Sequence, residues 1–168
     1  MRRSTEFRVV QSGYIDSKPH PKEDAKFEVD VIFTGFRSTL AAMQTASELT
    51  RNLDARIRLL VMQNVPLSWS VDCPPVSLNF IEERCRRMAL QCAEACEVKI
   101  DVYLCWDKWQ ALRQALSPRS LIVIGGKRRL WSSQEQKLAR RLESEGHRVV
   151  FADMRCAHPP LAIEHEPV

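Results

Sequence analysis

The sequence predicts an α/β fold, a three-layer α/β/α sandwich around a five-stranded parallel sheet. Short β-branched runs alternate with longer amphipathic stretches, and each strand candidate is joined to the next through a helical segment. Such connections are right-handed crossovers, which place helices on both faces of a parallel sheet. The length of 168 residues and the 45% hydrophobic content suit one packed domain and exclude disorder throughout.

The chain divides into three parts by pattern. Residues 1–28 lack sustained periodicity and are predicted to form an irregular arm, in which Phe7–Val10 could add a short edge strand. Residues 29–153 carry the alternating pattern and form the domain. Residues 154–168 are expected to be a flexible tail, because their prolines, histidines and acidic residues offer little to pack.

The first half of the domain predicts two strands and two helices. Val29–Phe36 and Ile57–Val65 have strand character. From Ser38, apolar residues recur at three- and four-residue steps, which predicts a core-facing helix through Leu40, Met43, Ala46, Leu49 and Leu53. Ser77–Glu97 is predicted to be a long helix whose apolar face carries Leu78, Ile81, Cys85, Met88, Cys92 and Cys96.

The third and fourth strands follow, with a short helix between them. Val98–Cys105 is the third strand, and Asp107 is the N-cap of a short helix that ends before Pro118. Leu121–Ile124 is short and wholly apolar, as expected for a strand covered on both faces, and it is followed by two glycines.

The last helix and strand are indicated by their end signals. Ser132 and Glu135 have the spacing of a capping box, which predicts the start of a helix. Gly146 is a natural left-handed stop for that helix, and Arg148–Phe151 has the character of a fifth strand.

Two loops are candidates for a ligand site, because ligands of such sheets bind outside the carboxyl ends of the strands. They are Thr34–Ser38 and Gly125–Ser133. The second is basic, since residues 127–155 hold eight basic and four acidic side chains. A helix start with free amides, hydroxyls and nearby cations can bind an anion. The alternative is a solvated basic turn with an ordinary cap.

Three segments resemble the universal stress protein family over residues 29–153. They are Val31–Met43, Leu59–Pro66 and Ser120–Gly126, in that order and with those intervening helices. The resemblance implies the strand order 3-2-1-4-5, a role in stress response or regulation, and a homodimer through the last strand, here Val149, Val150 and Phe151. One branch of the family binds ATP through an aspartate after the first strand and a glycine-rich loop after the fourth.

The chain departs from the ATP-binding branch at both positions. Thr34 stands in the place of the aspartate, and no glycine follows Gly126 until Gly146. Side chains as large as Arg128 obstruct the close backbone approach that a triphosphate loop needs. We therefore expect a non-catalytic stress-related or regulatory domain without standard ATP binding, and no catalytic residue is predicted.

The alternative function is a nucleotide- or phosphate-binding protein or enzyme that uses the loop after the fourth strand. ATP or another adenine nucleotide is then the candidate ligand. Its predicted binding residues are Thr34, Gly35, Met62, Gly125, Gly126, Lys127, Arg128, Ser132 and Ser133. Trp106, Trp109 and Trp131 lie near the same strand ends and either line a pocket or cover the sheet edge.

Other chemistry is weakly supported by the residues. The chain has six cysteines but no Cys-x-x-Cys pair, and those on the long helix are read as core residues, whereas Cys73 and Cys156 are candidates for oxidation. No metal site is predicted, and His147 is expected at the edge opposite the ligand loops. Phosphate-loop and nucleophile-elbow motifs are absent.

The expected partners follow from composition and charge. A formal net charge of +4 without aromatics interleaved among the basic residues does not favour nucleic-acid binding. No apolar run reaches the length of a membrane span, so a cytoplasmic protein is expected. The arm or the tail could bind a protein partner.

Overall fold

The computed structural model of the protein describes residues 7–15, 27–66, 68, 78–90, 97–127 and 133–154. Within these ranges the elements in chain order are β1 (Phe7–Ile15), β2 (Phe27–Ile32), α1 (Phe36–Thr50), β3 (Ala55–Asn64), α2 (Leu78–Leu90), β4 (Glu97–Cys105), α3 (Lys108–Ala115), β5 (Leu121–Gly126), α4 (Gln134–Ser144) and β6 (Arg148–Asp153).

The sheet has the order β1-β4-β3-β2-β5-β6. The five strands from β2 to β6 pair in parallel, which confirms the predicted order 3-2-1-4-5. The sixth strand, β1, runs antiparallel to β4 with a register shift between Val9 and Gln11. The prediction of an irregular arm was therefore wrong over residues 7–15. The edge strand expected at Phe7–Val10 is present there, and it extends to Ile15. The parallel sheet also begins at Phe27, ahead of the predicted boundary at residue 29.

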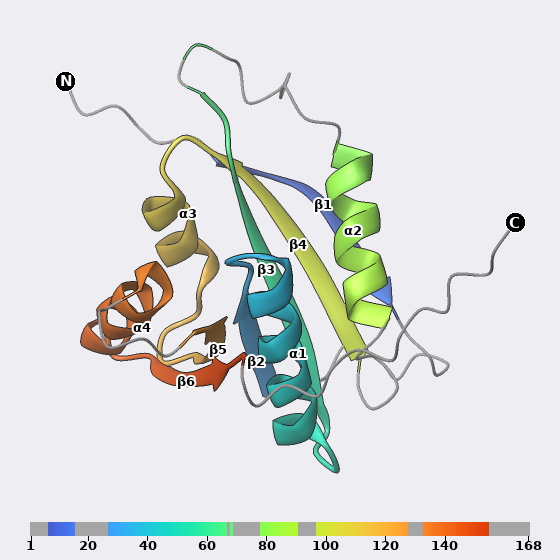
Figure 1. Cartoon of the computed structure of the whole chain (residues 1–168). Coiled ribbons are helices and arrows are strands. Elements are labelled where there is room, and N and C mark those ends of the chain that lie inside the picture. The colour runs from blue at the N-terminus through green and yellow to red at the C-terminus, as the bar shows by residue number, and fades with distance from the viewer. Residues whose placement is uncertain are drawn as a thin grey trace, which may run out of the picture.

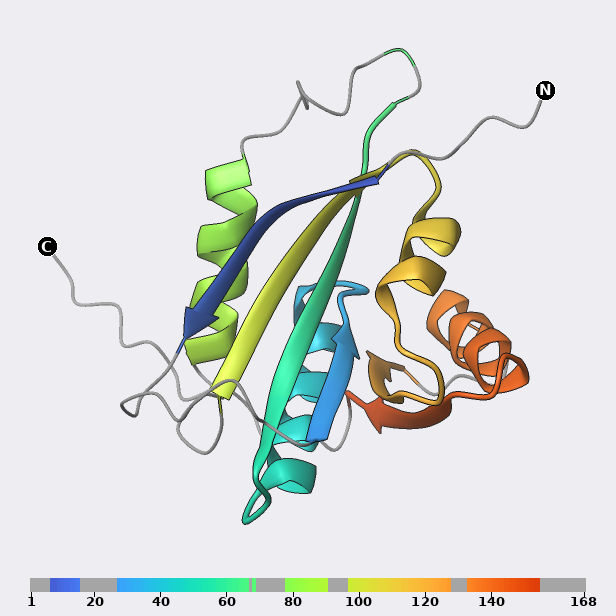
Figure 2. The same ribbon diagram turned by 180° about the vertical axis from the view of Figure 1, so that it is seen from behind.

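Helices cover the two faces of the sheet in pairs, α1 with α2 and α3 with α4 (Figures 1 and 2). Alternation along each strand sorts the side chains between two cores. Val29 and Val31 of β2 pack with α1 and α2, whereas Ile32 packs with α3 and α4. The apolar strands are thus covered on both sides, as their composition predicted.

The apolar stripe of α1 differs from the predicted one at its end. Met43 and Ala46 are buried as expected, but Leu49 is 41% and Leu53 is 56% exposed. The buried face continues through Thr50, whose hydroxyl donates to the carbonyl of Ala46 at 2.9 Å. Leu53 follows the last helical residue, so the helical period no longer applies to it.

The helix α2 confirms part of the predicted cysteine face. Cys85 and Met88 are buried between α2 and the sheet. The structure describes this helix as far as Leu90, and the predicted face beyond it, with Cys92 and Cys96, lies outside the described residues.

The cap of α3 was predicted correctly, and that of α4 was displaced by one residue. The Asp107 carboxylate accepts from the amides of Trp109 and Gln110 at 2.8 and 3.1 Å. The capping box of α4 is formed by Ser133 and Gln136, not by Ser132 and Glu135. Both pairs have the required spacing, so the pattern alone could not select the first residue of the helix. Gly146, at φ +90°, ends the helix region as predicted.

The carboxyl end of β5 lies against the backbone of the first turn of α1. A Cβ built on Gly125 would stand 1.7 Å from the carbonyl oxygen of Ser38. The Thr34 hydroxyl donates to the Gly125 carbonyl at 3.2 Å across the same junction. Glycine is therefore required at position 125 by close backbone approach.

This approach predicts a large loss of stability in Gly125→Ala. The added methyl group meets backbone, which cannot rotate away, so the free energy of unfolding should fall by about 3 kcal/mol or more. The matched control is Gly35→Ala, since position 35 has an extended backbone and its nearest contact is the Ser38 Oγ at 3.8 Å. Urea unfolding followed by circular dichroism measures both, and equal stability of the two variants would contradict the packing.

Candidate functional site

A cavity of about 620 Å³ opens beyond the carboxyl ends of β2 and β3, between α3 and α4. We call it the α3–α4 cavity. Its volume lies in the range of small-molecule sites. It is lined by Ile32, Phe33, Thr34, Met62, Lys108, Trp109, Leu112, Gln134, Glu135, Lys137, Leu138 and Arg141.

The floor of the cavity is apolar. Ile32, Met62 and Leu112 belong to the core between the sheet and the helices α3 and α4. Leu138 and Trp109 pack against the same core while remaining partly exposed. A ligand in this cavity can therefore bury an apolar or aromatic part against the core.

The rim of the cavity is basic. Lys108 comes from α3, and Lys137 and Arg141 come from α4, against one carboxylate, that of Glu135, among the described lining residues. All three cations are exposed. The guanidinium of Arg141 stands 3.7 Å from the centroid of the Trp109 ring, so a cation–π contact joins the two helices across the cavity.

Local structure explains how these side chains come together. Asp107 caps α3 and so places Lys108 and Trp109 in its first turn, directly after the carboxyl end of β4. On α4 the lining residues Gln134, Leu138 and Arg141 recur at helical steps on one face.

The cavity also receives the positive ends of two helix dipoles. The first residues of α3 and α4, Lys108 and Gln134, both line it. Helix N-termini favour negative charge, but the Asp107 carboxylate already accepts from the first amides of α3, so the rim cations are the main attraction for an anion. An anion with a planar or apolar body is the chemistry that suits this arrangement.

Two of the predicted binding residues line the cavity, Thr34 and Met62. Gly35, Lys127 and Ser133 are described but do not line it. Arg128 and Ser132 lie in the part of the chain that the structure does not describe.

Gly125 and Gly126 also lie outside the lining, and packing accounts for both glycines. A Cβ on Gly126 would stand 2.8 Å from the Phe151 ring and 3.1 Å from the Cβ of Glu135. At the start of α4 the amide of Gln136 donates to Ser133 Oγ at 3.2 Å, and the amide of Ser133 donates to Gln136 Oε1 at 3.0 Å. Two of the amides at this helix start are therefore already bonded within the chain.

Four charged residues of the described lining were not predicted from the sequence: Lys108, Glu135, Lys137 and Arg141. Two sequence signals could have found them. Lys108 follows the predicted N-cap Asp107, just after the end of a strand. A helical projection of α4 places its lining residues on one face. The tryptophans were expected either to line a pocket or to cover the sheet edge. Trp109 lines the cavity, whereas Trp106 packs against Val65 and Leu104. Trp131 lies outside the described residues.

Other candidate chemistry is sparse in the described part of the chain. No group of three His, Cys, Asp or Glu residues there could hold a metal ion. His147 precedes β6 at the amino edge of the sheet, away from the cavity, as predicted. No helix of the described residues has the length and apolar character needed to cross a membrane. Cys73, Cys156, His158 and His165 lie outside the described residues.

Comparisons with protein-family models, with curated proteins and with solved structures found no match to this chain.

The described cysteines are predicted to react slowly in the folded chain. Burial raises the pKa of the Cys85 and Cys105 thiols from 9.0 to about 11. At pH 8 about one such thiol in a thousand is then a thiolate, so iodoacetamide should label both far more slowly than free cysteine. Peptide mass spectrometry measures this, with the guanidinium-unfolded chain as control. Equal rates in the folded and unfolded chains would contradict the burial.

The raised pKa values also make the free energy of unfolding depend on pH. Because the folded state disfavours the thiolate, this contribution to stability is fully present below about pH 9 and is lost as the pH rises toward about 11.

Proposed function

We propose that this chain is a non-catalytic regulatory module that binds a small anionic ligand with a planar ring in the α3–α4 cavity. An adenine nucleotide is the first candidate. The observation that carries the proposal is the cavity itself, whose described lining combines an apolar floor and the Trp109 ring with a rim of three cations and one carboxylate. A nucleotide presents the complementary combination of an aromatic base and a phosphate.

A role in stress response goes with this proposal through the resemblance of the sequence to universal stress proteins. The strand order of the parallel sheet is the order that the resemblance implies. The ligand would enter beside Thr34 at the carboxyl ends of the strands, where ligands of such sheets bind. We also propose a cytoplasmic location, with which the free thiols of Cys85 and Cys105 are compatible.

Binding is tested first by thermal unfolding of the full chain with AMP, ADP, ATP and cyclic AMP, each with and without Mg²⁺. A ligand that binds only the folded state stabilises it by about 2.7 kcal/mol at a hundredfold excess over Kd. The expected result is a raised Tm with at least one nucleotide. An unchanged Tm with all four would contradict an adenine nucleotide as the ligand.

The position of the ligand is tested by Arg141→Gln, with the neighbouring Arg140→Gln as the matched control. Both arginines are exposed on α4, but only Arg141 lines the cavity. Loss of a charged hydrogen bond should weaken binding about 10- to 100-fold in Arg141→Gln and leave Arg140→Gln unchanged. Isothermal titration calorimetry measures both.

The alternative site at the loop after β5 gives the opposite result. If Lys127 and Arg128 hold the phosphate at the start of α4, the double variant Lys127→Ala, Arg128→Ala loses binding and Arg141→Gln retains it. That outcome would reject the α3–α4 cavity and support the loop.

We further propose a homodimer through the outer edge of β6. This strand ends the sheet and pairs only with β5 among the described strands. The amides of Arg148 and Met154 donate toward Ser120 and Gly126 on the β5 side. By alternation, the amides of Val149 and Phe151 point to the open edge, where a second copy can pair with them.

Loss of an outward amide is predicted to dissociate the dimer. Val149→Pro removes one outward donor at an edge position that tolerates proline, whereas Val149→Thr keeps both the donor and the β-branch. Sedimentation equilibrium should show a dimer for the native chain and for Val149→Thr, and an at least tenfold weaker dimer for Val149→Pro. A native chain that sediments as a monomer would contradict the proposal.

A further inference from the structure

An exposed patch of aromatic and basic side chains lies at the carboxyl edge of the sheet, on the α1 and α2 side. The rings of Phe36 and Phe80 are 42% and 58% exposed. The guanidinium of Arg84 lies 6.0 Å from the centroid of the Phe36 ring and 5.5 Å from that of Phe80, so it joins α1 to α2. We call Phe36, Arg37, Phe80, Arg84 and Lys127 the edge patch.

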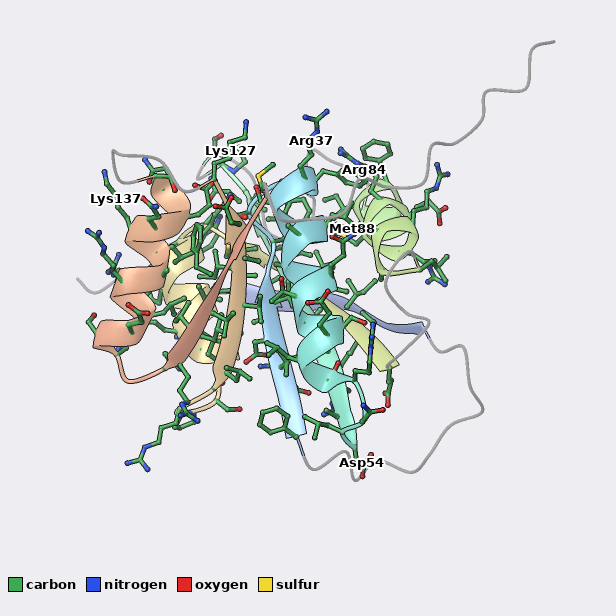
Figure 3. The ribbon with its side chains drawn as sticks, turned by 60° about the horizontal axis from the view of Figure 1, so that its bottom comes forward. Arg37, Asp54, Arg84, Met88, Lys127 and Lys137 are labelled. Atoms are coloured by element: carbon green, nitrogen blue, oxygen red, sulfur yellow. The ribbon has the colours of Figure 1, made fainter. Side chains whose placement is uncertain are left out.

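The charge of the edge patch is unbalanced. Figure 3 shows Arg37, Arg84 and Lys127 along one edge of the molecule and Asp54 at the opposite edge. None of the three cations forms an ion pair with a described carboxylate, whereas Arg87 on the same helix as Arg84 bonds Glu83 at 2.9 Å. Exposed rings beside unpaired cations suit an occupant that is both apolar and acidic.

The chain leaves the described structure beside this patch. The amide of Met154 donates to the Gly126 carbonyl at 3.1 Å, and its Sδ accepts from the Ser38 hydroxyl at 3.5 Å. Met154 is therefore fixed to α1 next to Arg37. Seven further residues, fully extended, can reach about 25 Å from that point.

The segment that follows has the complementary chemistry. Residues 156–168 contain no lysine or arginine, and they place Leu161 and Ile163 directly before Glu164 and Glu166. Because this segment is tethered to the edge patch by a short connection, its effective concentration there is in the millimolar range, well above that of a free partner.

We propose that residues 156–168 of this chain dock on the edge patch of the same molecule. Leu161 and Ile163 cover the exposed rings of Phe36 and Phe80. Glu164 and Glu166 pair with the cations of Arg37, Arg84 and Lys127.

The experiment is photo-crosslinking in the full chain. The benzophenone amino acid p-benzoylphenylalanine replaces Phe80, which keeps an aromatic side chain at an exposed position. The matched control carries it in place of Phe27, which is 43% exposed at the opposite edge of the sheet. After irradiation, peptide mass spectrometry locates the cross-link, and gel electrophoresis separates cross-links within one chain from those between chains.

The expected result is a cross-link from position 80 to residues 156–168 within one chain, and none to that segment from position 27. Glu164→Gln with Glu166→Gln should lower the yield roughly threefold or more, because both variants lose the negative charge that the cations attract, and His158→Gln should not, because His158 carries no negative charge. The yield should also fall as the ionic strength rises from about 0.05 M to about 0.5 M.

Charge reversal separates docking from mere proximity. Arg84→Glu should lower the yield, and Arg84→Glu combined with Glu164→Arg and Glu166→Arg should restore it. No cross-link to residues 156–168, a cross-link to a second copy only, or a yield insensitive to these charges would overturn the proposal.

Discussion

The fold depends on the contact between two backbones, at the point where β5 ends against the first turn of α1. Only a glycine at position 125 leaves room for the Ser38 carbonyl, and the Thr34 hydroxyl bonds the Gly125 carbonyl beside it. Through this contact the helix that follows β2 is held against β5 at the point where the strand order reverses. One face of this point is thereby filled by α1, and the other face remains for the α3–α4 cavity. The α3–α4 cavity thus lies on the opposite face of the sheet from α1.

A buried polar layer forms the second constraint, on the cavity side of the sheet. Asp30, only 2% exposed, accepts from the Arg58 Nε at 2.7 Å, and the Arg58 Nη2 donates to the Ala115 carbonyl at 3.2 Å. Arg56 and Arg58 also pair with Glu28, at 2.6 and 3.1 Å. Burial of such charges is tolerated only when they are paired and hydrogen-bonded. The layer therefore specifies register between β2 and β3 and holds the end of α3 on the sheet, while apolar residues are left for the cavity floor.

The parallel core could be predicted because the hydrophobic periodicity and the residues that begin or end each helix and strand agree along residues 29–153. The apolar strand Leu121–Ile124, the Asp107 cap and the Gly146 stop are local signals, and each was correct in the structure. The strand β1 could not be predicted in full, since its partner β4 is about 90 residues away in sequence and an edge strand needs no strong pattern of its own. Most of the cavity was missed for the same reason. Arg141 and Trp109 look like ordinary helix residues until packing places α3 beside α4, whereas the glycines that looked like a ligand loop are required by neighbouring backbone and side chains.

The described lining of the α3–α4 cavity comes from strand ends and from two helices. Helices held by a packed core keep their side chains in place, whereas loops vary more freely during evolution. Relatives of this chain would then be recognised by the identity of positions 109, 138 and 141 on α3 and α4, more than by the sequence of their loops.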